Sequence, residues 1–339
     1  MTMFRPHIAW QIHINQIPLL KIMFYNQPLN YPMISLAPLK ILTLAKASHE
    51  HRYPHLSAAS GLVKIGNKLY VVADDENHLG LFLQEGNADG ELIELFSGSL
   101  PLPLEERKAA KPDLEVLTHI PSSTQYPHGA LLTLGSGSKD TRRKGVIVAL
   151  NEQGELEGME EIDLTELYNK LKQEIGKLNI EGAVIIDEDI ILFQRGNKKN
   201  KLNASIRIPL KHFYRSVLMT DKKRKLDITI TTYELGEIGG IPLCFTDATP
   251  LPNGAIVFTA AAENTDDSYL DGTCMGSIIG VINAKGNLRS INTIDKIVKA
   301  EGVEACVIDN KVQLLLVTDA DDETPPAQLY TAELIGYPF

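Results

Sequence analysis

Residues 60–96 contain four short apolar segments separated by turn residues: SGLVKI at 60–65, LYVVAD at 69–74, HLGLFL at 78–83 and ELIELF at 91–96. Each segment is rich in Val, Ile, Leu and aromatic side chains, which is typical of β-strands. The Gly66-Asn67 pair between the first two segments is a hairpin signal. This stretch therefore predicts four antiparallel strands that are connected up and down in one sheet.

The same four-strand pattern returns along the chain at intervals of roughly 50 to 65 residues, the size range of β-propeller blades once loop insertions are counted. LEVLTHI at 114–120, EGAVII at 181–186 and ATPL at 248–251 open the second, third and fourth repeats. The pattern predicts an all-β fold in which each repeat forms one blade.

The fifth repeat is incomplete, because the chain ends after EACVI at 304–308, QLLLVTD at 313–319 and QLYTAEL at 328–334. The segment LKILTLA at 39–45 supplies the missing outer strand, and this pairing removes two open sheet edges. We therefore predict one β-propeller domain over residues 33–339, with five four-stranded blades. Six blades are the alternative.

One segment departs from the strand pattern. Asp163-Leu-Thr-Glu166 resembles a helix capping box. Apolar residues then recur at helical spacing, namely Leu164, Leu167, Leu171, Ile175 and Leu178. The segment predicts an amphipathic helix that is inserted between two blades.

The N-terminal 32 residues mix apolar and polar side chains without a clean hydrophobic stretch or a small-residue cleavage site. We expect residues 1–32 to be a loose arm or an over-extended start, with Met33 as the alternative first residue. No uninterrupted apolar run approaches the roughly 18 residues that span a bilayer, so we expect no membrane association.

Charge and cysteine content limit the partners. The formal net charge is −10 and the pI is about 5.4, which argues against nucleic acid because phosphate binding needs clustered Lys and Arg. Cys244, Cys274 and Cys306 are odd in number and lack metal-ligand spacing. We expect them to be reduced, which favours a cytoplasmic protein.

Aligning the repeats at the entry to their first strands places five residues in equivalent positions: Ser60, Glu115, Glu181, Asp247 and Glu304. First strands line the central channel of a propeller, so four carboxylates would converge there. Clustered carboxylates repel one another unless a cation neutralises them. The pattern predicts a divalent metal, with Ca²⁺ favoured by an all-oxygen ligand set. Glu301 competes with Glu304 for its position. The alternative is that these acids are structural and accept hydrogen bonds from backbone N–H groups or pair with Arg.

A second group of polar residues follows the second strands and is expected around the same mouth. Asp74, Asp75 and Asp319 offer carboxylates, and Arg195 offers a guanidinium suited to a carboxylate or phosphate. His128, just before the second strand of its blade, is a candidate base. We predict catalytic roles for these five residues and a polar or anionic small-molecule ligand.

Two motifs resemble a known group of propellers: Glu181-Gly182 at the start of an inner strand, and Glu301-Gly302-Val303-Glu304 followed by VTDAD. They look like the Glu-Gly strand entries of uncharacterised bacterial propellers related to esterase-like phytase domains and, distantly, to calcium-dependent sugar lactonases. The resemblance implies a divalent metal at the axis, with Glu181 or Glu301 as a ligand.

Two functions remain open on the sequence. The first is a metal-dependent hydrolase of an ester, lactone or phosphoester, with the carboxylates holding the ion and Arg195 orienting the substrate. The second is a non-catalytic propeller that binds a ligand or partner, because propellers host many functions.

Overall fold

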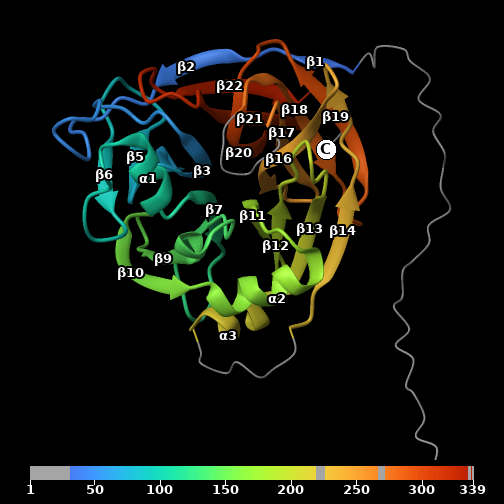
Figure 1. Ribbon diagram of the computed structural model, residues 1–339, viewed down its shortest axis with the longest axis horizontal. Coiled ribbons are helices and arrows are strands. Elements are labelled where there is room, and N and C mark those ends of the chain that lie inside the picture. Colours follow the sequence, from blue (N-terminus) through green and yellow to red (C-terminus); the bar gives the residue numbers. More distant parts are fainter. Residues whose placement is uncertain (1–30, 219–225, 266–271, 335–336, 338–339) are drawn as a thin grey trace, which may run out of the picture. The chain divides into compact units, whose positions relative to one another are not determined.

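The computed structural model describes residues 31–218, 226–265, 272–334 and 337. Five sheets are arranged in a ring around a central axis (Figure 1). This arrangement confirms the predicted five-bladed β-propeller and rules out the six-bladed alternative. The predicted arm, residues 1–32, lies outside the described residues except for Tyr31 and Pro32.

The first three blades are four-stranded antiparallel sheets whose strands follow one another along the chain. The first blade contains β3 (Ala59–Ile65), β4 (Lys68–Ala73), β5 (His78–Leu83) and β6 (Glu91–Glu94). The second contains β7 (Leu114–Ile120), β8 (Ala130–Gly135), β9 (Lys144–Leu150) and β10 (Leu156–Asp163). The third contains β11 (Ile180–Ile186), β12 (Asp189–Gln194), β13 (Asn203–Pro209) and β14 (Thr229–Tyr233).

The last two blades take strands from both ends of the described chain. The fourth contains β15 (Glu237–Ile238), β16 (Ile241–Pro250), β17 (Ile256–Glu263), β18 (Cys274–Ile282), β19 (Leu288–Ile294) and, parallel to β19, β1 (Met33–Ile34). The fifth contains β20 (Lys299–Ile308), β21 (Lys311–Asp319), β22 (Gln328–Leu334) and β2 (Ala37–Ile41). The N-terminal segment therefore closes the ring as predicted, and it also extends the fourth blade.

The inner strands β3, β7, β11, β16 and β20 form a closed ring in which each contacts its two neighbours. Glycine permits the closest approaches. A Cβ at Gly302 would lie 2.9 Å from the backbone nitrogen of Leu62 on the next blade, and one at Gly182 would lie 3.0 Å from the Cα of Asp247. Any residue larger than glycine at these two positions would push neighbouring blades apart.

Apolar side chains fill the space between the blades. The described residues form five buried hydrophobic clusters, and each cluster joins two adjacent blades. Between the third and fourth blades, for example, Phe193 contacts Phe245 edge to face, with ring centroids 5.1 Å apart. The core is therefore distributed around the ring, and the axis is left for polar residues.

The closing segment can be tested with two adjacent residues. Leu42 is fully buried between the first and fifth blades and donates its N–H to the Ala327 carbonyl at 3.0 Å, whereas the neighbouring Ile41 is 42% exposed. We expect Leu42→Ala to lower the free energy of unfolding by about 2–4 kcal/mol, because it leaves a cavity in the closing contact. Ile41→Ala should cost under about 1 kcal/mol. Denaturant unfolding of both variants measures the difference, and equal losses would contradict the closing role.

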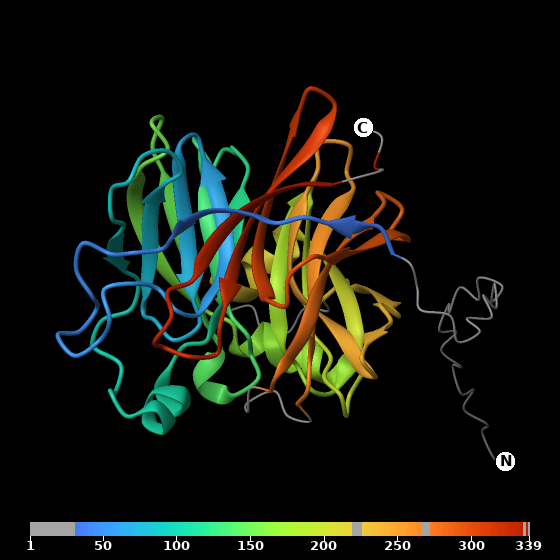
Figure 2. The same ribbon diagram turned by 90° about the horizontal axis from the view of Figure 1, so that it is seen from above.

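The described residues also form three α-helices and a short 3-10 helix, Asp140–Arg142, outside the blades. The predicted helix is confirmed as α2 (Thr165–Ile175), which buries Leu167 and Leu171 between the second and third blades. Instead of a full capping box, the Asp163 carboxylate accepts the N–H of Thr165 at 2.8 Å. Sequence analysis did not predict α1 (Leu104–Ala110) or α3 (Leu210–Leu218). The helices α1 and α2 lie along the same side of the blades (Figure 2). Among the described helices, none has the length and apolar content to cross a membrane.

Candidate functional site

Each inner strand carries a β-bulge or comparable irregularity in its register. The bulges fall between Ala59 and Gly61, Leu114 and Val116, Ile180 and Gly182, Phe245 and Asp247, and Ala300 and Val303. A bulge adds a residue to one strand and redirects its side chain. The repeated bulge therefore marks the structurally equivalent positions of the five blades.

The bulges correct the sequence alignment at two of its five positions. Ser60, Glu115 and Glu181 occupy the bulges as aligned, but the fourth and fifth bulges hold Thr246 and Glu301-Gly302. Asp247 and Glu304 lie one and two residues beyond their bulges. On the sequence, either Glu301 or Glu304 could take the equivalent position in the fifth blade, and the backbone register places Glu301 there.

A polar pocket opens at the axis where inner strands begin and second strands end. We call it the axial pocket. Seven carboxylates line it: Asp74, Asp113, Glu115, Glu181, Glu263, Glu301 and Asp319. Five cationic residues line it as well: Lys108, Lys111, Arg142, Arg195 and Lys299. Seven acids and five bases give the lining a formal charge of −2 when every group is ionised, a state that an added cation would stabilise.

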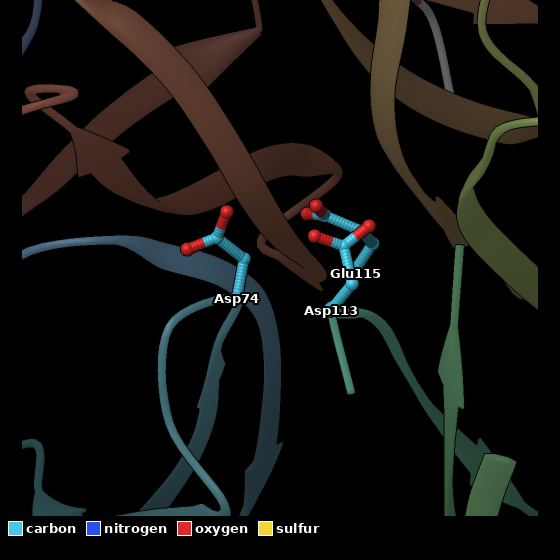
Figure 3. A group of neighbouring side chains, drawn as sticks. All are labelled: Asp74, Asp113 and Glu115. Carbon is cyan, nitrogen blue, oxygen red and sulfur yellow. The ribbon is translucent and has the colours of Figure 1, made fainter. Parts of the chain in front are cut away.

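Three of these acids form a compact group. Asp74 follows β4 of the first blade, whereas Asp113 and Glu115 stand at the start of β7 in the second blade (Figure 3). One carboxylate oxygen from each residue lies within 4.8 Å of the others. This largely buried group could hold a metal ion, and we call it the acid triad.

Two cations hold Asp113 in place. Lys111 pairs with Asp113 at 3.0 Å and also with Asp74, and Arg142 contacts Asp113 at 2.7 Å. The Ser136 hydroxyl donates to the same carboxylate. Burial opposes ionisation, but Lys111 and Arg142 outweigh it and hold the pKa of Asp113 below its usual value.

The other two members of the triad are short of positive charge. Burial raises the pKa of Asp74 to about 7 despite its contact with Lys111. Burial, followed by repulsion from Glu181 and Asp113, raises the pKa of Glu115 well above its usual value. An additional cation would relieve this repulsion.

Across the pocket, Arg195 joins three blades. Its guanidinium contacts Glu181 of β11 at 2.9 Å, Glu263 of β17 at 2.5 Å and Glu301 of β20 at 3.6 Å. Burial opposes its charge, but these carboxylates raise the pKa of Arg195 well above its usual value. The guanidinium that sequence analysis assigned to an anionic substrate is thus surrounded by the protein's own acids.

Lys299 is a second buried cation that pairs with several carboxylates. Its ammonium lies 3.0 Å from Asp319, 2.6 Å from Asp321 and 3.3 Å from Glu301. Glu301 is nevertheless poorly satisfied, because it is 2% exposed and neither carboxylate oxygen has a hydrogen-bond donor within the described chain. A buried acceptor without a donor is costly, so Glu301 is a position where a ligand would gain affinity.

The remaining predicted residues lie elsewhere. Asp247 accepts the Val303 N–H at 2.8 Å and Glu304 accepts the Lys64 N–H at 3.1 Å, and neither lines the axial pocket as far as the chain is described. Asp75 pairs with Arg52 beside the pocket. His128 is exposed and precedes β8, at the end opposite to the mouth.

Lys111 and Asp113 were not among the residues predicted from the sequence. A signal for Lys111 was present, because Glu105 and Glu106 open α1 and Arg107 and Lys108 close it, the charge order that favours a helix. Asp113 adopts a left-handed backbone conformation, with φ of 58°. This turn aims a residue outside the strand pattern toward the axis, and sequence spacing gives no sign of it.

The comparisons with solved structures return only distant likenesses. The catalytic domain of a Coprinopsis cinerea GH62 α-L-arabinofuranosidase is 10% identical, with 89% of this chain and 96% of that chain covered and a TM-score of 0.48. A Xanthomonas campestris gluconolactonase is 10% identical, with coverages of 91% and 99% and a TM-score of 0.38. A Synechocystis apocarotenoid oxygenase mutant is 14% identical, with coverages of 83% and 73% and a TM-score of 0.32. Likenesses this distant carry no argument about activity.

No curated protein matches the chain. A family model, in contrast, matches residues 55–334, which span the blades from β3 to β22. The chain therefore belongs to the DUF6929 family, a family of unknown function.

Proposed function

We propose that the protein is a metal-dependent hydrolase of an ester, lactone or phosphoester, with Asp74, Asp113 and Glu115 holding a divalent cation. The observation that carries the proposal is the acid triad, in which three carboxylate oxygens from two blades lie within 4.8 Å of one another. Oxygen ligands of this kind suit Ca²⁺, Mg²⁺ or Mn²⁺, and we favour Ca²⁺.

The residues present fit such an ion. Asp74 and Glu115 lack enough positive charge to stay ionised readily, as their raised pKa values indicate. Three carboxylates provide fewer ligands than Ca²⁺ takes, so coordination positions would be left for water and substrate. When bound, the cation would polarise a carbonyl or phosphoryl oxygen or acidify a water molecule. Lys111 and Arg142 would keep Asp113 oriented.

We place the ion at the triad and not between Glu181 and Glu301. The lactonase resemblance implies a ligand role for one of these two glutamates. Glu181 pairs with Arg195 at 2.9 Å, and Glu301 lies 3.6 Å from Arg195 and 3.3 Å from Lys299, so both glutamates already have cationic partners. In the triad, Lys111 and Arg142 pair with Asp74 and Asp113, but Glu115 forms no ion pair among the described residues. Glu181 and Glu301 would then not bind the ion, and their role would be to hold the Arg195 guanidinium in place.

The experiment compares thermal unfolding of chelated protein with protein titrated with Ca²⁺, Mg²⁺ and Mn²⁺. An ion bound by the folded state alone raises the melting temperature saturably. We expect Glu115→Gln to abolish this rise, whereas Asp247→Asn, buried outside the triad, should retain it. Turnover of ester, lactone and phosphoester panels by the ion-loaded protein tests the hydrolase. An unchanged ion response in Glu115→Gln would refute the site.

A non-catalytic role is the second candidate. It is favoured by the position of the triad across two blades, because an ion there would tie the first blade to the second. Ion-dependent stabilisation without turnover of any panel substrate would support this role over hydrolysis.

A further inference from the structure

A second, larger hollow adjoins the axial pocket. We call it the side cavity. It has a volume of about 390 Å³, which falls within the range of small-molecule sites. Its walls are α1 and the loop of residues 319–324, with Ser57, Ala58 and Asp75 between them. Asp74, Lys108, Lys111 and Asp319 line both the side cavity and the axial pocket, so the two spaces meet beside Asp74 of the acid triad.

The lining of the side cavity is acidic. Six carboxylates line it: Asp74, Asp75, Asp319, Asp321, Asp322 and Glu323. Three cations oppose them: Arg107, Lys108 and Lys111. In formal charges, a divalent ion at the triad would reduce this excess from three to one and not reverse it. Within the 319–324 loop, Asp319 and Asp321 pair with Lys299 and Glu323 pairs with Arg107, whereas exposed Asp322 has no ion pair among the described residues.

The cations of the cavity already have partners. Arg107 pairs with Glu323 and approaches Asp75 to 3.9 Å. Lys111 pairs with Asp74 and Asp113, and Lys108 is also engaged in an interaction. An anionic ligand would have to displace a carboxylate to gain a counter-ion, which leaves that carboxylate unpaired.

Some acids, in contrast, have spare acceptor capacity. In the side cavity, Oδ1 of Asp75 is buried and has no hydrogen-bond donor within the described residues. Glu301, 2% exposed in the adjoining axial pocket, accepts no hydrogen bond on either oxygen from the described residues, although Lys299 and Arg195 lie 3.3 and 3.6 Å from its Oε1. Asp322 is exposed and accepts the backbone N–H of Thr324 at 2.8 Å, which leaves its other oxygen outside this bond. These groups match a ligand that donates hydrogen bonds and carries positive charge.

One wall of the cavity is apolar. Leu104, the first residue of α1, lines the cavity and is 53% exposed. Leu104 lies beside the charged side chains that line the side cavity, so it offers a contact for the hydrocarbon part of a ligand.

The geometry points to a substrate that carries an ammonium or similar cationic group beside an apolar segment, and that reaches the axial site through the side cavity. This inference rests on the proposed function, because it identifies the class of molecule on which the triad would act. It differs from the polar or anionic ligand expected from the sequence, since the guanidinium expected to bind an anion is held by carboxylates.

The test uses three probes of equal chain length: hexylammonium, 1-hexanol and hexanoate. Each is titrated into calcium-loaded and chelated protein, and binding is followed by saturation-transfer NMR and by the melting temperature. We expect saturable binding of hexylammonium, at least about tenfold weaker binding of 1-hexanol, and no binding of hexanoate. Added salt should weaken hexylammonium binding.

Variants that change one charge test whether hexylammonium binds in the side cavity. Leu104→Lys adds a cation to an exposed position of the cavity wall and should weaken hexylammonium binding about tenfold. Met159→Lys adds the same charge at a 53% exposed position on β10, the outer strand of the second blade, and should change nothing. Asp322→Asn keeps an acceptor for Thr324 and should weaken binding a few-fold.

The outcomes separate the two proposals. Binding of hexanoate as tight as that of hexylammonium, or hexylammonium binding that Leu104→Lys leaves unchanged, overturns the inference. Failure of Ca²⁺, Mg²⁺ and Mn²⁺ to stabilise the protein overturns the metal site instead, and hexylammonium binding in the chelated protein still decides the ligand class.

Discussion

Replacing Arg195 with methionine is expected to lower the free energy of unfolding by about 3–5 kcal/mol. The substitution keeps an aliphatic chain at the axis but leaves Glu181, Glu263 and Glu301 buried without their shared counter-ion. Removing one partner of a buried ion pair costs this much because the remaining charge stays desolvated. Urea unfolding of the chelated protein at pH 7.5 measures the loss.

The matched control is Arg207→Met. Arg207 contacts Asp189 at 2.9 Å, but the two side chains are 40% and 30% exposed. Solvent screens this pair, so its loss should cost under about 1 kcal/mol. Similar losses in the two variants would show that Arg195 does not organise the axis.

Stability is expected to fall as pH rises from about 4.5 to about 7, with Glu304 as a principal cause. Burial raises the pKa of Glu304 from 4.5 to about 7, although the Lys64 and Ala305 N–H groups act against it. The folded protein then binds this proton more tightly than the unfolded chain, so the free energy of unfolding decreases through that interval and levels off above it. After allowance for solvent screening, the effect amounts to about 2 kcal/mol.

Glu304→Gln removes the titration. We expect it to raise the free energy of unfolding by about 2 kcal/mol at pH 8 and to change it little at pH 4. Glu157→Gln, at an exposed position on β10, controls for the loss of a carboxylate at the surface. Parallel pH profiles of wild-type protein and Glu304→Gln would contradict the assignment.

The blade count could be predicted because turn chemistry and strand length are local properties. Gly66, at φ of 61°, adopts the left-handed backbone expected of the Gly66-Asn67 hairpin, and Ile65 pairs with Lys68 across it. The closing strand was also predictable, because an incomplete last repeat requires a partner. Its bounds shifted from 39–45 to Ala37–Ile41, and the pairing of β1 with the fourth blade carried no sequence signal.

The candidate site was predicted less completely, for a geometric reason. Charge type and strand ends identified Asp74, Glu115, Glu181, Arg195 and Asp319, all of which line the axial pocket. Bulges shifted the last two repeats, so Asp247 and Glu304 took the place of Thr246 and Glu301 in the alignment. Pairing of the acids with Arg was an open alternative, but the sequence does not show that Arg195 lies among three of them.

The pairing of β2 with β22 has a consequence for synthesis of the protein. Lys40 lies opposite Leu329, so the N-terminal strand leaves the ribosome on the order of tens of seconds before its partner is translated. During that interval an unsatisfied strand edge and Leu42 face the cellular milieu. The nascent chain thus carries an unpaired strand until β22 has been translated, and chaperone binding during that interval would limit aggregation.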